Sequence, residues 1–131
     1  LKASWWKTYM LPKLHRFVES KWLLKKYKYQ DIISNFFTDI DKEENIYPSI
    51  VANYDRSPRG GKKAVIFYDS TPNLFKQHLL EAIDCIKHKD EQHRILFLRS
   101  WNEWGEGNYI EPDEKWGKAY LNVIREVLNQ K

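Results

Sequence analysis

Apolar residues recur every three or four positions in three stretches of this chain, which is the spacing of one face of an α-helix. The stretches cover residues 29–40, 74–86 and 116–128. A Ser-Thr-Pro sequence at residues 70–72 precedes the second stretch. There a hydroxyl can cap free amide groups, and proline is tolerated in the first turn. The pattern therefore predicts three helices.

Shorter apolar runs lie between these stretches and predict strands. Residues 46–53 are partly β-branched and bounded by polar clusters, and residues 64–68 form a brief extended piece. Residues 95–98 are continuously apolar, which is typical of a strand covered on both faces of a parallel sheet. Turn-forming residues at 54–63 and a charged run at 39–45 predict loops. Strands that alternate with helices, without a tight hairpin, indicate an α/β protein.

The length and composition indicate one folded domain. The chain has 131 residues, of which 42% are hydrophobic and 15% aromatic, enough to bury a sizeable core. It opens at Leu1 without an initiating methionine, so we expect the carboxyl-terminal part of a longer protein. Residues 1–28 are interpreted as a basic, aromatic remnant of the upstream chain, with a short helix over residues 12–21. Residues 29–131 are interpreted as the βα units.

The net charge of +4 is unevenly distributed. Residues 1–30 contain eight lysines and arginines against Glu19 alone, a net charge of +7, which leaves −3 for the remaining 101 residues. One interpretation places the lysines against phosphate, on an anionic membrane face or on a nucleotide or lipid diphosphate donor. The other is a solvated face, or a surface docked on an acidic part of the missing chain. The lysines concerned are Lys21, Lys25, Lys26 and Lys28.

The cysteine and histidine positions give no sign of a metal or cofactor. Cys85 is the single cysteine, which excludes an internal disulfide and favours a reducing compartment. Its helical spacing with apolar neighbours predicts an inert, packed thiol. The four histidines show no paired ligand spacing, so we predict no metal site and no cofactor. No apolar run approaches the roughly 18 residues that cross a bilayer, and we expect a soluble, cytoplasmic protein.

Residues 99–112 combine carboxylates, aromatic rings and glycines directly after an apolar run. Aromatic faces cover the C–H surface of a sugar ring, and carboxylates accept its hydroxyl groups. We therefore predict a carbohydrate site with Glu103 and Glu106 as the acid–base pair. The structural alternative for each glutamate is a turn cap or an ion pair with Arg99 or Arg59. The predicted substrate contacts in this stretch are Trp101, Asn102, Trp104, Tyr109 and Glu111.

A second loop is expected to reach the same site. Loops that leave the carboxyl ends of parallel strands gather on one face, where barrel enzymes carry their active sites. The loop at residues 54–59 leaves such a strand end, and it adds Tyr54, Asp55 and Arg59 to the predicted substrate contacts. Asp113 and Glu114, by contrast, are interpreted as favourable charges at the amino terminus of the last helix.

The stretch Trp-Asn-Glu-Trp-Gly-Glu-Gly-Asn-Tyr-Ile-Glu-Pro-Asp at 101–113 resembles the carboxyl-terminal signature of the WbsX-type glycosyltransferases of bacterial surface-polysaccharide synthesis. The segments at 53–59 and 70–75 resemble two further motifs of that family. WbsX-type proteins are similar in turn to the family 99 endo-α-mannosidases, which are (β/α)8 barrels. The resemblance implies that Glu103 is a base toward the sugar 2-hydroxyl and Glu106 the acid and base at the bridging oxygen. A full barrel needs about 250 residues, so we expect the carboxyl-terminal half of a TIM-type barrel.

These features leave more than one function open. The leading hypothesis is glycosyl transfer or glycosidic-bond hydrolysis in lipopolysaccharide or capsule metabolism. Its partners would be an oligosaccharide or glycan and a nucleotide-sugar or lipid-linked donor, with no nucleic acid. One alternative is a glycan-binding module in which aromatic rings stack sugars and no bond is broken. Another is an interaction domain that makes peripheral membrane contact through residues 1–30. Open strand edges could also join copies into a homo-oligomer.

Overall fold

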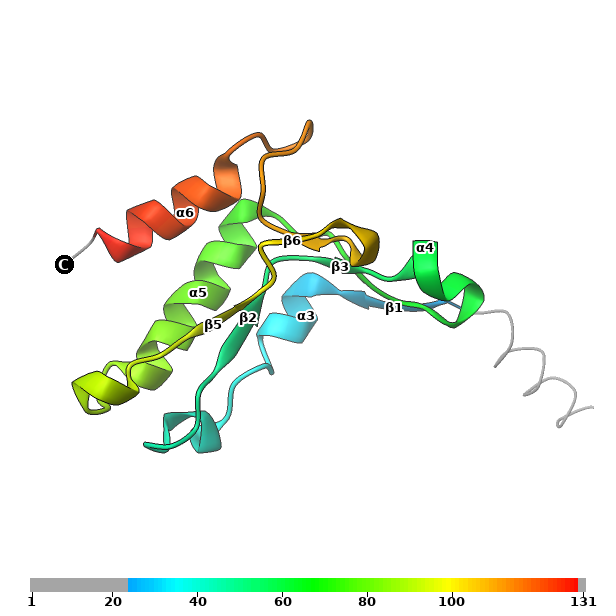
Figure 1. Ribbon diagram of the computed structural model, residues 1–131. Helices are drawn as coiled ribbons and strands as arrows, with labels where there is room; N and C mark the ends of the chain where they lie inside the picture. The colour runs from blue at the N-terminus through cyan, green and yellow to red at the C-terminus, as the bar shows by residue number, and fades with distance from the viewer. Residues whose placement is uncertain (1–23, 130–131) are drawn as a thin grey trace, which may run out of the picture.

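The computed structural model describes residues 24–129, which form a mixed α/β fold (Figure 1). The central strands are β2 (Ser49–Val51) and β5 (Phe97–Arg99), which pair in parallel. Helix α5 (Pro72–Ile86) precedes β5 in the chain and packs against β2. Helix α6 (Ala119–Leu128) packs against α5. The α/β prediction is therefore confirmed. The described residues contain no closed barrel.

A second small sheet lies beside this pair. Its order is β1 (Lys25–Lys28), β4 (Val65–Tyr68) and β3 (Tyr54–Asp55), with β1 parallel and β3 antiparallel to β4. Strand β1 thus belongs to a sheet, although its residues fall within the predicted basic segment 1–28. The predicted helix at 12–21 lies outside the described residues, and the division of the chain at residue 28 stays a prediction.

The predicted helix at 29–40 is wrong beyond Ile33. Helix α3 covers only Tyr29–Ile33. The Ser34 hydroxyl and the Asn35 amide both donate hydrogen bonds to the Asp31 carbonyl, at 3.1 and 3.2 Å. Side chains that bond nearby backbone in this way compete with the regular helical ladder. The aromatic residues that follow pack on a buried histidine instead of continuing the helical face.

The charged run at 39–45 is more ordered than the predicted loop. Residues Asp39–Lys42 form a 3-10 helix, η2, and the Thr38 N–H donates to the Asp41 carboxylate at 2.7 Å. The buried ammonium group of Lys89, just after α5, donates to the carbonyls of Asp41 and Ile46. This lysine therefore fastens η2 to the end of α5. The 3-10 turn η4 (Glu91–His93) follows Lys89.

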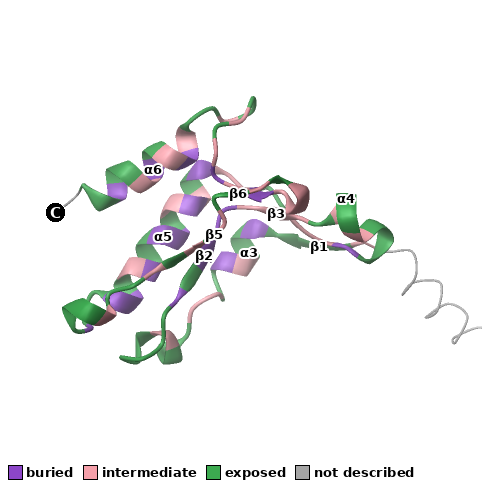
Figure 2. Cartoon of the chain, viewed as in Figure 1, coloured by how far each residue is buried: buried purple, intermediate pink, exposed green. Residues whose placement is uncertain are grey.

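Two hydrophobic clusters hold β2 from opposite sides, as the buried positions in Figure 2 indicate. Ile50 belongs to the cluster with α5 and α6, and the adjacent Val51 belongs to the cluster with α3. Successive side chains of a strand point to opposite faces, so one strand serves both cores. The Tyr29 hydroxyl donates to the Val51 carbonyl at 2.6 Å and joins α3 to β2.

The predictions for α5 and its neighbours succeed to different degrees. Helix α5 begins at Pro72, as predicted, and the Thr71 hydroxyl accepts a hydrogen bond from the Leu74 N–H at 3.3 Å. Strand β4 and helix α6 are also confirmed. The prediction that the strand at 95–98 is covered on both faces is wrong, because Phe97 is 57% exposed. Among the described residues, β5 has β2 as its only partner strand.

The loops near the predicted site contain more structure than expected. Residues 54–63 hold β3, one helical turn α4 (Ser57–Gly60) and the 3-10 turn η3 (Gly61–Lys63). An antiparallel hairpin follows β5: β6 (Asn102–Glu103), the 3-10 turn η5 (Trp104–Glu106) and β7 (Asn108–Tyr109). The expected absence of a tight hairpin is therefore wrong. No helix in residues 24–129 is long and apolar enough to span a bilayer.

Candidate functional site

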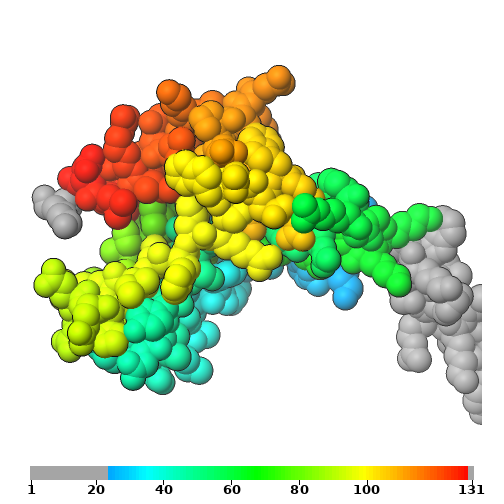
Figure 3. All heavy atoms as spheres, viewed as in Figure 1, coloured from blue at the N-terminus to red at the C-terminus, as the bar shows by residue number. Residues whose placement is uncertain are grey.

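The hairpin after β5 brings both predicted catalytic glutamates to the loop after β3. Figure 3 shows the segments around residues 100–110 and 55–60 next to one another on the surface, and η5 contacts α4. The Arg59 guanidinium lies between the two carboxylates: Nη2 is 3.1 Å from Glu103 Oε1, and Nη1 is 3.9 Å from Glu106 Oε1. The two acidic side chains therefore face one shared cation.

Two further arginines approach Glu106. Arg56 Nε lies 3.5 Å from Oε1, and Arg99 Nη2 lies 3.6 Å from Oε2. The Glu106 side chain is 14% exposed, whereas that of Glu103 is 42% exposed. The arginines themselves are more than half exposed, so each pair contributes little stability in water. The structural alternative foreseen for the glutamates, an ion pair with Arg59 or Arg99, is therefore present, and their catalytic role stays a prediction.

Two glycines allow the loops to approach this closely. A Cβ at Gly105 would lie 2.7 Å from Arg59 Nη2, so the absent side chain leaves room for the guanidinium. Gly107 has φ +53, and a Cβ there would lie 3.0 Å from both Cβ and N of Asp55. Left-handed backbone and close contact both favour glycine. The Asp55 carboxylate accepts a hydrogen bond from the Ser57 N–H at 2.8 Å and so orders the start of α4.

The aromatic residues of the motif do not gather in one place. The rings of Trp104 and Tyr109 stack with centroids 3.7 Å apart and an interplanar angle of 14°. The Trp104 indole N–H donates to Glu111 Oε2 at 2.6 Å, which fixes the ring from one edge. Trp101 and Asn102 are exposed, and Asn102 pairs with Tyr109 in the hairpin. Tyr54 packs against Phe67, with ring centroids 5.4 Å apart, and belongs to the core around α3.

The buried Asn108 holds the base of the hairpin. Its side-chain oxygen accepts a hydrogen bond from the Ser100 N–H at 3.0 Å, and the Ser100 hydroxyl donates to the Asn108 carbonyl at 2.6 Å. The same hydroxyl accepts from the Glu103 N–H at 3.2 Å. Ser100 and Asn108 therefore set the position of Glu103 through its backbone. Neither residue was among the predicted site residues, although both lie inside the motif.

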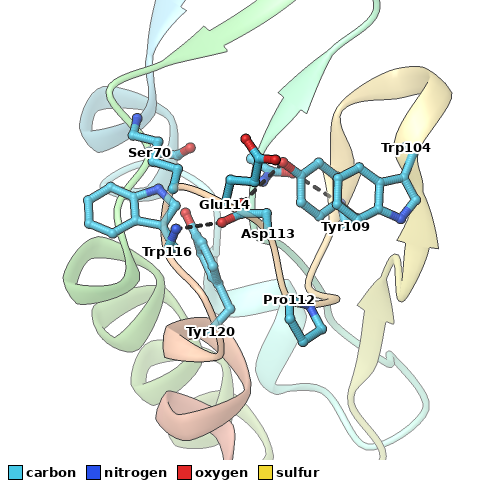
Figure 4. A pocket seen from close by; sticks show the side chains of 10 residues that line it. Ser70, Trp104, Tyr109, Pro112, Asp113, Glu114, Trp116 and Tyr120 are labelled. Atoms are coloured by element: carbon cyan, nitrogen blue, oxygen red, sulfur yellow. Dashed lines mark hydrogen bonds between the residues drawn. The ribbon is translucent and has the colours of Figure 1, made fainter.

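A pocket of about 730 Å³ lies between β7 and the start of α6 (Figure 4). We call it the Asp113 pocket. Neither Glu103 nor Glu106 lines it, whereas Asn53 and Ser70 do. Most of its wall is aromatic or acidic, and comes from Trp104, Tyr109, Asp113, Glu114, Trp116 and Tyr120.

Asp113 and Glu114 do not have the role that the sequence suggested. Helix α6 begins at Ala119 and has no acidic residue in its first turn. Asp113 instead accepts hydrogen bonds on both oxygens, from the Trp116 N–H at 2.5 Å and from the Tyr109 hydroxyl at 3.1 Å, as Figure 4 shows. The acidic and aromatic residues at 109–116 could have indicated this pocket, since they continue the composition of the motif.

The pKa values of two tyrosines in the pocket are raised above the ordinary value. Burial raises the pKa of Tyr109, and its hydrogen bond to the Asp113 carboxylate raises that pKa further. Burial also raises the pKa of Tyr120, an effect that the neighbouring Ser70 side chain partly opposes. Both hydroxyls thus keep their protons at neutral pH. Within residues 24–129, no three His, Cys, Asp or Glu side chains gather as they would around a metal ion.

Comparison with known proteins gives the family of this chain. Residues 4–124 match the family described as Glycosyltransferase WbsX. The chain belongs to the WbsX family. The match includes the hairpin with Glu103 and Glu106 as well as the Asp113 pocket, so the family relationship covers both parts of the site.

Two curated relatives of this WbsX-family chain are bacterial proteins. Both are named uncharacterized protein WxcX, from strain B100 and a second strain of Xanthomonas campestris pv. campestris. Each is 29% identical over 90 residues, which cover 68% of this chain and 13% of WxcX. The chain therefore spans a small part of the length of these relatives. No solved structure gives a significant match.

Proposed function

We propose that this chain supplies the acid–base pair for glycosyl transfer or glycosidic-bond hydrolysis in bacterial surface-polysaccharide metabolism. The observation that supports it most is the shared Arg59 guanidinium, which brings the carboxylates of Glu103 and Glu106 to one place. Membership of the WbsX family supports the carbohydrate chemistry. Paired carboxylates in unlike surroundings are the usual equipment for reaction at a glycosidic bond.

The two glutamates have surroundings that suit different roles. Glu103 is the more exposed, and we assign it the role of a base that accepts a proton from a sugar hydroxyl, the 2-hydroxyl in a family 99-like reaction. Glu106 is largely enclosed, and we assign it the transfer of a proton to and from the bridging oxygen. An enclosed position protects this proton transfer from exchange with bulk water.

The arginines around the glutamates are compatible with a sugar site. Arg56, Arg59 and Arg99 contact the carboxylate oxygens through side chains that are more than half exposed. Because these side chains are long and largely exposed, sugar hydroxyls can displace them at low cost. A displaced guanidinium is also suited to a phosphate of a nucleotide-sugar or lipid-linked donor, since it binds phosphate through two parallel hydrogen bonds.

The fold of the whole protein is part of the proposal. Strands β2 and β5 pair in parallel, the connection between them runs through β3, α4, η3, β4, α5 and η4, and β5 carries the hairpin at its carboxyl end. Active sites of TIM-type barrels lie at this end of the strands. We propose that these strands belong to the carboxyl-terminal half of such a barrel, in a cytoplasmic enzyme. The exposed Lys25, Lys26 and Lys28 on β1 would then be available to an anionic donor or membrane.

The test uses protein purified from its own host and surface polysaccharide extracted from the same cells, with and without nucleotide sugars. Released or elongated glycans are measured by chromatography. Glu103→Gln and Glu106→Gln should each lower product formation by a factor of about 100 or more. The matched control is Glu91→Gln, an exposed glutamate of η4, which should leave it unchanged. Full product formation in both site variants refutes the assignment.

A second candidate is glycan binding without bond cleavage. It is favoured by the arginine partners of both glutamates, because a carboxylate that serves only structure is commonly paired in this way. On this hypothesis the extract binds saturably and no new product forms, and the two Gln variants bind as the original protein does. Product that depends on Glu103 and Glu106 excludes it.

A further inference from the structure

Beyond the glutamate pair, we propose that the Asp113 pocket binds one uncharged pyranose ring of a glycan. Neither Glu103 nor Glu106 lines this pocket, so binding there does not require either residue to be catalytic. Its volume of about 730 Å³ lies within the range of small-molecule sites, roughly 300–1,000 Å³. The case depends on three features: a fixed carboxylate, a buried hydroxyl without a hydrogen bond of standard geometry, and a stacked aromatic wall.

The Asp113 carboxylate is held in place and still has acceptor capacity. One hydrogen bond reaches each oxygen, from the Trp116 N–H and from the Tyr109 hydroxyl. An ionised carboxylate can accept about four hydrogen bonds, so each oxygen retains one free position. Two adjacent hydroxyls of a pyranose can donate to two such oxygens together. Fixing the acceptor in advance lowers the entropy lost when the sugar binds.

The Tyr120 hydroxyl is a buried polar group that a ligand could satisfy. Tyr120 is 3% exposed, it lines the pocket, and no hydrogen bond of standard geometry reaches its hydroxyl in the described part of the chain, although the Ser70 side chain lies close enough to lower its pKa. Leaving such a group without a partner is unfavourable. A sugar hydroxyl in the pocket would supply a well-aligned partner. Figure 4 shows Tyr120 beside Trp116 on one side of Asp113, opposite the Tyr109 and Trp104 rings.

The aromatic wall provides the apolar contact that sugars need. Trp104 stacks on Tyr109 by one face and is 47% exposed, so its ring retains surface for a ligand. Its hydrogen bond to Glu111 keeps the indole oriented. An aromatic ring that covers C–H groups, next to fixed polar acceptors, is the combination that pyranose recognition requires.

The charge of the pocket limits the kind of sugar. Asp113 and Glu114 line it together with one cation, Lys115, whose ammonium group lies 5.0 Å from the centroid of the Trp116 ring. Like charges within a few ångströms repel, and burial strengthens the repulsion. The pocket should therefore accept a neutral ring and reject a uronic acid.

Saturation-transfer NMR on the full chain tests this with methyl glycosides of glucose, galactose, mannose and glucuronic acid. At least one neutral glycoside should bind, and the glucuronide should not. Tyr120→Phe should weaken that binding about three- to tenfold, because it removes only this hydroxyl. Asp113→Asn should weaken it at least as much. Tyr47→Phe is the matched control, since Tyr47 bonds to His93 and lies outside the pocket.

The proposal is overturned if no neutral glycoside binds, if Tyr120→Phe and Asp113→Asn bind it as the original chain does, or if the glucuronide binds equally well. The variants Glu103→Gln and Glu106→Gln separate this proposal from the catalytic one. They should retain glycoside binding while losing product formation. Retained product formation with normal binding refutes only the catalytic pair, and absent binding refutes only the pocket.

Discussion

The guanidinium group of Arg59 fills the space that Gly105 leaves open. A Cβ at Gly105 would lie 2.7 Å from Nη2, 2.8 Å from Cζ and 2.9 Å from Nε of this arginine. The contact involves the far end of a flexible side chain, which can move aside. The position of Arg59 between the two glutamates therefore depends on the absence of a side chain at residue 105.

Gly105→Ala should displace the Arg59 guanidinium and impair product formation while the free energy of unfolding changes by less than about 1 kcal/mol. A double-mutant cycle checks the cause. In an Arg59→Ala background, adding Gly105→Ala should have no further effect on product formation, because the displaced group is already gone. An equal effect in both backgrounds would show that Gly105 acts by another route.

Gly107 should be needed for stability as well as for the site. Gly107→Ala places a Cβ 3.0 Å from the Asp55 backbone nitrogen, at a residue with φ +53. Gly117→Ala is the matched control, because Gly117 has φ +52 and nothing within 4 Å of a Cβ. Left-handed backbone costs both alanine variants about 1 kcal/mol. Urea unfolding should show Gly107→Ala to be less stable than the control by about 1 kcal/mol or more. Equal losses would mean that the contact with Asp55 relaxes freely.

The buried His78 should make stability depend on pH. Burial lowers its pKa to about 4, whereas the unfolded chain has the ordinary value of 6.5. The folded state therefore favours the neutral ring. This contribution is fully present above pH ~6.5 and is lost as pH falls toward ~4, a change of up to ~3 kcal/mol in the free energy of unfolding.

Urea unfolding between pH 4 and 7 checks the histidine prediction, with two variants. His78→Gln should flatten the pH dependence while keeping an acceptor for the Val51 N–H, which lies 3.4 Å from the His78 ring nitrogen. His88→Gln, at an exposed position, should leave the pH dependence as it is. A steep loss of stability that persists in His78→Gln would assign it to other groups.

Much of the fold follows from local sequence signals. The Ser-Thr-Pro sequence at 70–72 places the start of α5 correctly, because capping and proline geometry act over a few residues. The helix predicted at 29–40 is wrong beyond Ile33, because Phe36 and Phe37 fall at helical spacing but pack on a residue far away in the sequence. Their rings surround His78, with centroids 4.7 and 5.1 Å from its own, and that contact spans 41 residues or more of sequence. Periodicity alone does not reveal such a partner.

The candidate site also combines features that local sequence predicts with features that depend on contacts between distant segments. The approach of Arg59 to the two glutamates could be predicted, because these residues stand in two dense motifs on loops expected to converge. The Asp113 pocket could not, because Ser70, Asn53 and Tyr120 come from separate segments that only the packing of α5 and α6 brings together. Asp113 was interpreted as a helix-terminal charge, but the chain turns at Gly117 before α6 begins.

The most direct measurement of the central claim is the chain length and amount of surface polysaccharide made by the host. Strains would carry Glu103→Gln, Glu106→Gln or the control Glu91→Gln at equal protein levels, beside a strain that lacks the protein. Both site variants should reproduce the polysaccharide defect of the deletion strain, and Glu91→Gln should match the parent. Normal polysaccharide in both site variants, with a defect in the deletion strain, would contradict a catalytic role for the glutamate pair.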